Sequence, residues 1–147
     1  MHRDLAELCQ GPEVADDEYL YRRVPRRRSH LRETEGELRP TSAAFEDSEQ
    51  QISVDLASLR KDPRELCNYE GDGVLMLECG KVKRDVKCKD GSAFCGVWAD
   101  PVDGNEAHAL ICVRPTKAST GSFKQIKTAL VLIASWKIIP APLDDIV

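Results

Sequence analysis

A cluster of arginines is the feature of this sequence whose residue types and spacing best fit a chemical role. Six arginines and no acidic residue fall within residues 22–32, directly after an acidic start to the chain. Guanidinium groups make paired hydrogen bonds with phosphates and carboxylates. The cluster therefore predicts a contact with an anionic partner, made by Arg22, Arg23, Arg26, Arg27, Arg28 and Arg32. The alternative interpretation is a solvated loop whose charge is balanced by acidic residues on either side.

The cysteines could also do chemistry, through a metal ion or a disulfide. The chain has six of them: Cys9, Cys67, Cys79, Cys88, Cys95 and Cys112. Structural zinc sites usually bring two closely spaced pairs of ligands to one ion, and these cysteines are spaced too widely for that pattern. We expect no metal site, although turns in the fold could still gather four thiols. The start of the chain lacks the pattern of a signal peptide, so reduced thiols are expected.

Signatures of catalysis and of cofactor binding are missing from the sequence. It has no glycine-rich phosphate loop and no dinucleotide fingerprint, so no cofactor is expected. His108 lies in an apolar stretch, where a hydrogen-bonded core histidine is more common than a general base. Asp100 and Asp103 belong to a stretch with turn chemistry. No catalytic residue is predicted, and a binding protein is favoured over an enzyme.

Length and composition are typical of a single globular domain. The 147 residues are enough to bury a core, and 41% of them are hydrophobic. A formal net charge of -4 does not suit a protein that coats nucleic acid, and an aromatic content of 5% argues against a stacking surface for single strands. The longest apolar run, residues 129–139, is too short to cross a membrane. We expect a cytoplasmic protein with no membrane contact.

Alternation of apolar and polar residues predicts about five strands. They are expected at residues 18–24, 51–57, 73–78, 94–99 and 107–113, with a weaker edge strand at 81–88. Pro25 should end the first strand. Residues 26–51 have an irregular, polar pattern, which predicts a long loop.

Two helices are predicted. Asp62 and Pro63 suit the start of a short helix, and residues 122–139 carry a helical apolar stripe that Pro140 ends. The predicted class is α+β: a small mixed or antiparallel sheet of about five strands, a short mid-chain helix and a packed C-terminal helix. Residues 1–18 are expected to form an acidic tail and residues 19–147 a single domain.

Four stretches of the sequence resemble a group of small uncharacterised bacterial proteins. The stretches are Tyr21-Arg22-Arg23-Val24-Pro25, Arg39-Pro40-Thr41-Ser42-Ala43-Ala44-Phe45, Ile52-Ser53-Val54-Asp55-Leu56, and Asp100-Pro101 followed by Asn105-Glu106-Ala107-His108-Ala109-Leu110. This group has no assigned activity. The resemblance therefore implies a bacterial, cytoplasmic setting and no mechanism.

A second resemblance concerns the order of two residues. An arginine on an early strand followed by a serine, here Arg22 and Ser42, is similar to the arrangement in small toxins that act on NAD, including ADP-ribosyltransferase-like folds. In that family the arginine holds a phosphate and the serine supports the nicotinamide pocket. The resemblance implies that both residues share one pocket, with Glu106 as the late glutamate. The glycine-rich pocket residues of the family are missing.

These observations favour a non-catalytic interaction module of a bacterial multi-component system. The arginine-rich segment is expected to bind a protein partner, with nucleic acid as a further candidate ligand. The alternative is a small NAD-acting toxin enzyme.

Overall fold

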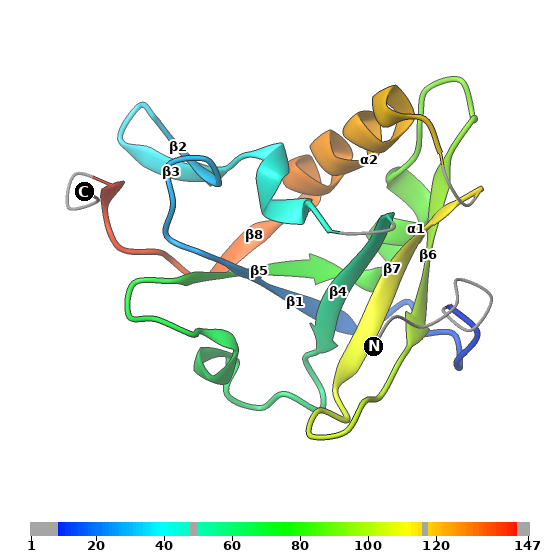
Figure 1. The fold of residues 1–147 in the computed structure, drawn as a ribbon, viewed down its shortest axis with the longest axis horizontal. Coiled ribbons are helices and arrows are strands. Elements are labelled where there is room, and N and C mark those ends of the chain that lie inside the picture. The colour runs from blue at the N-terminus through cyan, green and yellow to red at the C-terminus, as the bar shows by residue number, and fades with distance from the viewer. Residues whose placement is uncertain (1–8, 48–49, 116–117, 144–147) are drawn as a thin grey trace.

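The fold is built on a six-stranded antiparallel sheet with the strand order β6-β7-β4-β1-β5-β8 (Figure 1). This computed structural model describes residues 9–47, 50–115 and 118–143. The strands of the sheet are β1 (Tyr19–Val24), β4 (Gln51–Leu56), β5 (Gly73–Glu78), β6 (Phe94–Ala99), β7 (His108–Arg114) and β8 (Ser135–Ile138). A separate hairpin joins β2 (Leu31–Thr34) to β3 (Glu37–Pro40). The predicted α+β class is confirmed.

The described helices are α1 (Cys79–Asp85), α2 (Thr120–Ile133) and the 3₁₀ helices η2 (Ser42–Phe45) and η4 (Pro63–Leu66). Of these, α1, α2 and η2 contribute buried residues to the core. Helix α2 buries Phe123, Ile126 and Leu130 in one apolar cluster with Phe45 of η2 and the inward residues of the strands. Figure 1 shows α2, η2 and the β2–β3 hairpin following one another along the same side of the molecule.

Strand β1 lies at the centre of the sheet and presents two different faces. Leu20 and Val24 are fully buried in the core, and because side chains alternate along a strand, Arg22 projects to the same side. Tyr21 and Arg23 project to the opposite side. A charged residue on the core side needs polar partners, which the site described below supplies.

The two neighbours of β1 pair with it to different extents. Strand β5 pairs with all six residues of β1. Strand β4 pairs with only two of them, in the register Leu20↔Leu56 and Tyr21↔Asp55. Strands β1 and β4 therefore separate beyond Tyr21, as Figure 1 shows.

The prediction of a loop over residues 26–51 is wrong. The segment contains β2, β3 and η2 before β4 begins at Gln51. The hairpin turns at Glu35 and Gly36, which have positive φ angles of 51° and 82°, as a tight two-residue hairpin turn requires. Sequence reasoning missed it because a Glu-Gly pair is a weaker turn signal than Asn-Gly, and the strands are short and mostly polar.

The prediction of an edge strand over residues 81–88 is also wrong. This region forms α1, which buries Cys79 and Val82, and Val86 is buried directly after it. A spacing of three and four residues places these side chains on one helical face. Because the segment is short, the same residues also fit a weak alternation of apolar and polar side chains, which is why a strand was predicted there.

The predicted C-terminal helix is present but ends earlier than residue 139. Helix α2 begins after Ser119, whose Oγ accepts a hydrogen bond from the amide of Ser122 at 3.1 Å. It ends at Ile133, and β8 then pairs with β5. The last apolar residues of the predicted helix therefore belong to this strand.

The expectation of reduced thiols is wrong for one pair, because Cys9 and Cys112 form a disulfide. Cys112 lies on β7. After Cys9, residues 12–14 follow the outer edge of β6, where the amide of Val14 donates to Val97 O at 3.0 Å and that of Ala99 donates to Pro12 O at 2.8 Å. Residues 1–8 of the predicted acidic tail lie outside the described residues. Among the helices described, none has the length and apolar character to cross a membrane.

Candidate functional site

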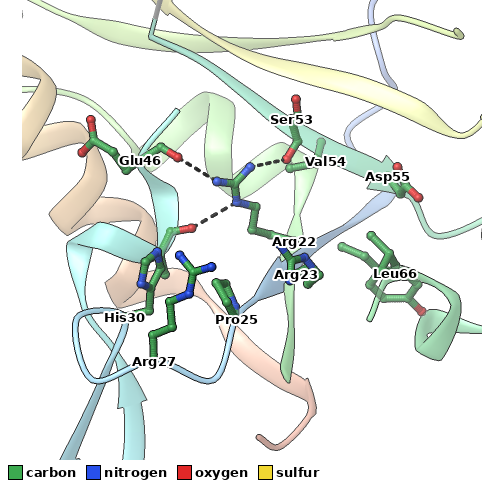
Figure 2. Close-up of a pocket in the computed structure, with 12 residues that line it drawn as sticks. Arg22, Arg23, Pro25, Arg27, His30, Glu46, Ser53, Val54, Asp55 and Leu66 are labelled. Carbon is green, nitrogen blue, oxygen red and sulfur yellow. Dashed lines mark hydrogen bonds between the residues drawn. The ribbon is translucent and has the colours of Figure 1, made fainter. Parts of the chain in front are cut away.

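A polar cavity of about 380 Å³ lies where β1 and β4 separate (Figure 2). Its walls come from β1 and the turn after it, from η2 and the residue that follows it, from β4 and from η4. Arg22, Arg23 and Arg27 all line it, together with His30. Three of the six predicted arginines therefore meet at one place.

Arg22 closes the gap between the two strands. Its guanidinium donates to Ala44 O at 3.1 Å, to Ser53 O at 2.8 Å and to Glu46 O at 2.9 Å (Figure 2). It also pairs with Asp47 at 3.2 Å. Burial lowers the pKa of Arg22, and the Asp47 carboxylate opposes that shift. These contacts replace the missing ladder between β1 and β4, so Arg22 is a structural residue.

Arg23 is neutralised by a buried carboxylate. Its Nη1 lies 3.0 Å from Asp72 Oδ2, and the Asp72 side chain is only 3% exposed. The same carboxylate accepts hydrogen bonds at 3.2 Å from the amides of Arg26, Asn68 and Tyr69. Asp72 thereby holds the end of β1 against the loop that follows η4.

Arg26 and Arg28 bind the C-terminal segment. Arg26 Nε donates to Pro142 O at 3.1 Å and to Ala141 O at 3.3 Å, and Arg28 Nη2 lies 3.5 Å from Leu143 O. Both side chains have further interactions. Neither lines the cavity.

Arg27 and His30 sit at the two ends of a tight turn. The amide of His30 donates to Arg27 O at 3.0 Å, and the amide of Arg27 donates to Pro25 O at 2.8 Å. Thr41 fixes the turn from the neighbouring segment, because its amide donates to His30 O at 2.9 Å and its hydroxyl to Ser29 O at 2.6 Å. A hydrogen bond between the first and fourth residues brings those two residues close together. Both side chains point into the cavity (Figure 2).

The charge in the cavity is unevenly compensated. Within the described part of the chain, the Arg27 side chain makes no hydrogen bond and no ion pair. The two acidic residues in the walls are already paired, Asp55 with Arg60 at 2.9 Å and Glu46 with Lys127. Arg27 is therefore the cavity cation that an incoming anion can neutralise.

His30 responds to this surplus of positive charge. Burial and the nearby Arg27, Arg22 and Arg23 lower the pKa of His30, so the ring is neutral at pH 7. Its Nδ1 lies 2.9 Å from Ser29 Oγ, and among the described residues its other nitrogen has no partner. The cavity therefore offers an anion one permanent cation, the Arg27 guanidinium, and one imidazole ring, that of His30, which becomes a second cation when it is protonated.

Sequence reasoning named Arg27 but missed His30 as a neighbour in the same site. The signal was present: Pro25 ends a strand, and two residues three positions apart in a turn can face one another. Arg32, the last of the predicted arginines, is exposed on β2 and does not line the cavity.

The residues that the other candidate functions require do not come together around this cavity. Ser42 and Glu106, which the NAD-toxin resemblance requires beside Arg22, are not among its lining residues. Across residues 9–47, 50–115 and 118–143, no three His, Cys, Asp or Glu residues cluster as metal ligands would. Cys79 and Cys95 are buried thiols, and burial raises their pKa values to about 11 and about 12. Thiols of this kind are poor nucleophiles.

Comparisons of the chain with family models, with curated proteins and with solved structures find no match.

Proposed function

We propose that this protein is a non-catalytic interaction module that binds an anionic group of a protein partner in the cavity between β1 and β4. The observation that carries the proposal is the guanidinium of Arg27, which is uncompensated among the described residues and points into a preformed cavity. The hydrogen-bonded turn fixes the backbone of Arg27. Its side chain is exposed and, among the described residues, has no hydrogen bond or ion pair that a ligand must displace. The cavity therefore offers one guanidinium to one carboxylate or phosphate.

A protein partner suits this site better than nucleic acid. Nucleic-acid affinity grows with the number of phosphates that a protein neutralises, whereas most of the arginine segment is already engaged. Arg22 and Arg23 pair with Asp47 and Asp72, and Arg26 binds backbone carbonyls of the C-terminal segment. One uncompensated cation in a concave site matches a single anionic side chain.

The proposed setting is a bacterial multi-component system in the cytoplasm, and the sequence resemblance implies the bacterial and cytoplasmic part of it. The Cys9–Cys112 disulfide is more typical of an oxidising compartment. Trapping thiols in intact host cells with an alkylating reagent, before lysis, tests this part of the proposal. Recovery of Cys9 in its alkylated form supports a cytoplasmic setting, and its recovery in the disulfide contradicts it.

The proposed function is tested by affinity capture from host lysate with two matched variants. Arg27→Glu reverses the charge in the cavity, and Arg32→Glu makes the same change at an exposed position outside it. We expect the wild type and Arg32→Glu to retain the same stoichiometric partner after nuclease treatment, and Arg27→Glu to lose it. If nuclease treatment abolishes capture of the partner, the arginine-rich segment binds nucleic acid instead. Equal capture by all three proteins would place the interface elsewhere.

A further inference from the structure

The ligand of the cavity can be specified further, on the basis of the function proposed above. We propose that the cavity binds a phosphate monoester, carried by a phosphorylated side chain of the partner, and that binding places a proton on His30. The inference rests on how Arg27 and His30 are held together and on the charge balance of the walls around them.

Geometry supports a ligand with several acceptor oxygens. Arg27 and His30 come from opposite ends of one turn, and both point into the cavity (Figure 2). Arg27 provides a planar fork of N–H donors, and protonated His30 provides another N–H. A phosphoryl group has three terminal oxygens, which can accept from both side chains at once. A carboxylate has two oxygens and is satisfied by the guanidinium alone.

The charge balance of the cavity also favours a dianion that brings a proton with it. Arg22 and Arg23 carry positive charge, but Asp47 and Asp72 neutralise them. Arg27 therefore supplies one uncompensated positive charge, whereas a phosphate monoester carries about -1.5 to -2 at pH 7. The second positive charge must come from a group that gains a proton, and His30 is the ring in the cavity wall that can do so.

The surroundings of His30 explain why the proton arrives with the ligand. In the free protein, Arg27 on its own turn and Arg22 and Arg23 on β1 disfavour the imidazolium. Glu46 is the acidic group facing the cavity beside η2, and it is paired with Lys127. A bound dianion reverses the local field and raises the pKa of His30. Between the lowered pKa of the free protein and the raised pKa of the complex, binding takes up one proton.

The sign of the pH dependence follows from this linkage. Affinity for a dianion is greatest below the pKa of free His30, and it falls as pH rises towards the pKa of the complex. One linked proton limits the fall to about tenfold per pH unit. A monoanion such as acetate requires no proton, so its binding should change little over the same range.

The experiment uses small anions and nuclear magnetic resonance, because a single phosphate binds weakly. Inorganic phosphate, sulfate and acetate are each titrated into the full chain from about pH 5.5 to about pH 8, which spans the titration of histidine. The Arg27 Nε–Hε and His30 ring resonances are followed. Sulfate stays a dianion throughout, so its pH dependence reports on the protein alone. A short phosphoserine peptide and its aspartate counterpart complete the set of ligands.

We expect phosphate, sulfate and the phosphoserine peptide to shift both resonances and to bind more tightly than acetate and the aspartate peptide. Arg27→Gln should weaken dianion binding by about 10- to 100-fold, the usual range for losing a hydrogen bond to a charged group. His30→Gln should remove the pH dependence of sulfate binding. Arg32→Gln, the matched control outside the cavity, should change neither property.

Three results would overturn the inference. Carboxylates that bind as tightly as the dianions would leave the proposed function standing and refute the phosphate. Sulfate affinity that keeps its pH dependence in His30→Gln would refute the role of that ring. If Arg27→Gln binds every anion as the wild type does, and Arg27→Glu also retains the partner, both the ligand and the proposed function fail.

Discussion

Arg22→Met is expected to destabilise the protein strongly, since Arg22 bridges β1 and β4 where their ladder ends. The substitution keeps an unbranched chain of similar length and removes every donor. Three carbonyls and the Asp47 carboxylate then lose their bond to Arg22, while Asp47 still accepts from the amide of Ser53 at 3.0 Å. Hydrogen bonds from a charged group contribute about 1.5–3 kcal/mol each. They are not additive, and because the side chain is 16% exposed, water replaces some of them.

We therefore expect a loss of about 3–5 kcal/mol, the usual cost of removing one partner from a buried ion pair. That is a large part of the roughly 5–15 kcal/mol by which a domain is stable. For a chain of this length, it corresponds to a fall of about 10–16 °C in Tm. Urea unfolding, followed through the fluorescence of Trp98 and Trp136, measures the free energy directly.

Two further variants make this test specific. Arg22→Lys keeps the positive charge but loses the planar set of guanidinium N–H donors, so it should retain only part of the stability that Arg22→Met loses. Arg32→Met makes the same substitution at an exposed position on β2, where the expected change is within about 0.5 kcal/mol. The structural assignment of Arg22 would be refuted if Arg22→Met cost no more than Arg32→Met. Arg22 would then be available to a ligand after all.

Three other predictions concern stability and thiol chemistry. Reduction of the disulfide should lower the free energy of unfolding by about 2–4 kcal/mol, and a Cys9→Ser variant should show the lower value with or without reductant. An effect of reductant on that variant would contradict the assignment to Cys9 and Cys112. Asp72→Asn should cost about 2–3 kcal/mol, because one carboxylate accepts from Arg23 and three backbone amides; hydrogen exchange should show those amides exposed, and unchanged protection would contradict it. Since burial raises the pKa of Cys95 to about 12, iodoacetamide at about pH 8 should leave it unmodified in the native protein and modify it after unfolding, as mass spectrometry can measure.

Much of the secondary structure could be predicted from the chain, because the signals there are local. Strand β4 has clean alternation with Ile52 and Val54 inward, and both are buried. The start of η4 also follows from sequence: Asp62 accepts from the amide of Arg64 at 3.0 Å, and Pro63 occupies the first turn. Such signals need only neighbouring residues to act.

The elements that were predicted wrongly depend on distant partners. Strand β8 is apolar enough to extend a helix, and it becomes a strand because β5 offers an edge with which Trp136 and Ser135 pair. In the same way, the β2–β3 hairpin is held in place by tertiary contacts such as the bond from Trp136 Nε1 to Leu38 O at 2.9 Å. Local propensity is a weak guide wherever packing supplies most of the free energy.

Local signals along the chain were enough to predict the α+β class and to locate the concentration of guanidinium groups after the first strand. The sequence could not separate the arginines by role, because each has the same chemistry and their partners lie far along the chain. Arg22 donates hydrogen bonds to carbonyls of η2 and β4, Arg23 pairs with Asp72, and Arg26 donates to carbonyls near the C-terminus. The tertiary structure leaves Arg27 uncompensated among the described residues and places it with His30 in one cavity. This decides which arginine can bind a ligand, because a guanidinium that already pairs with an acidic group or with carbonyls of the protein has fewer free donors to offer.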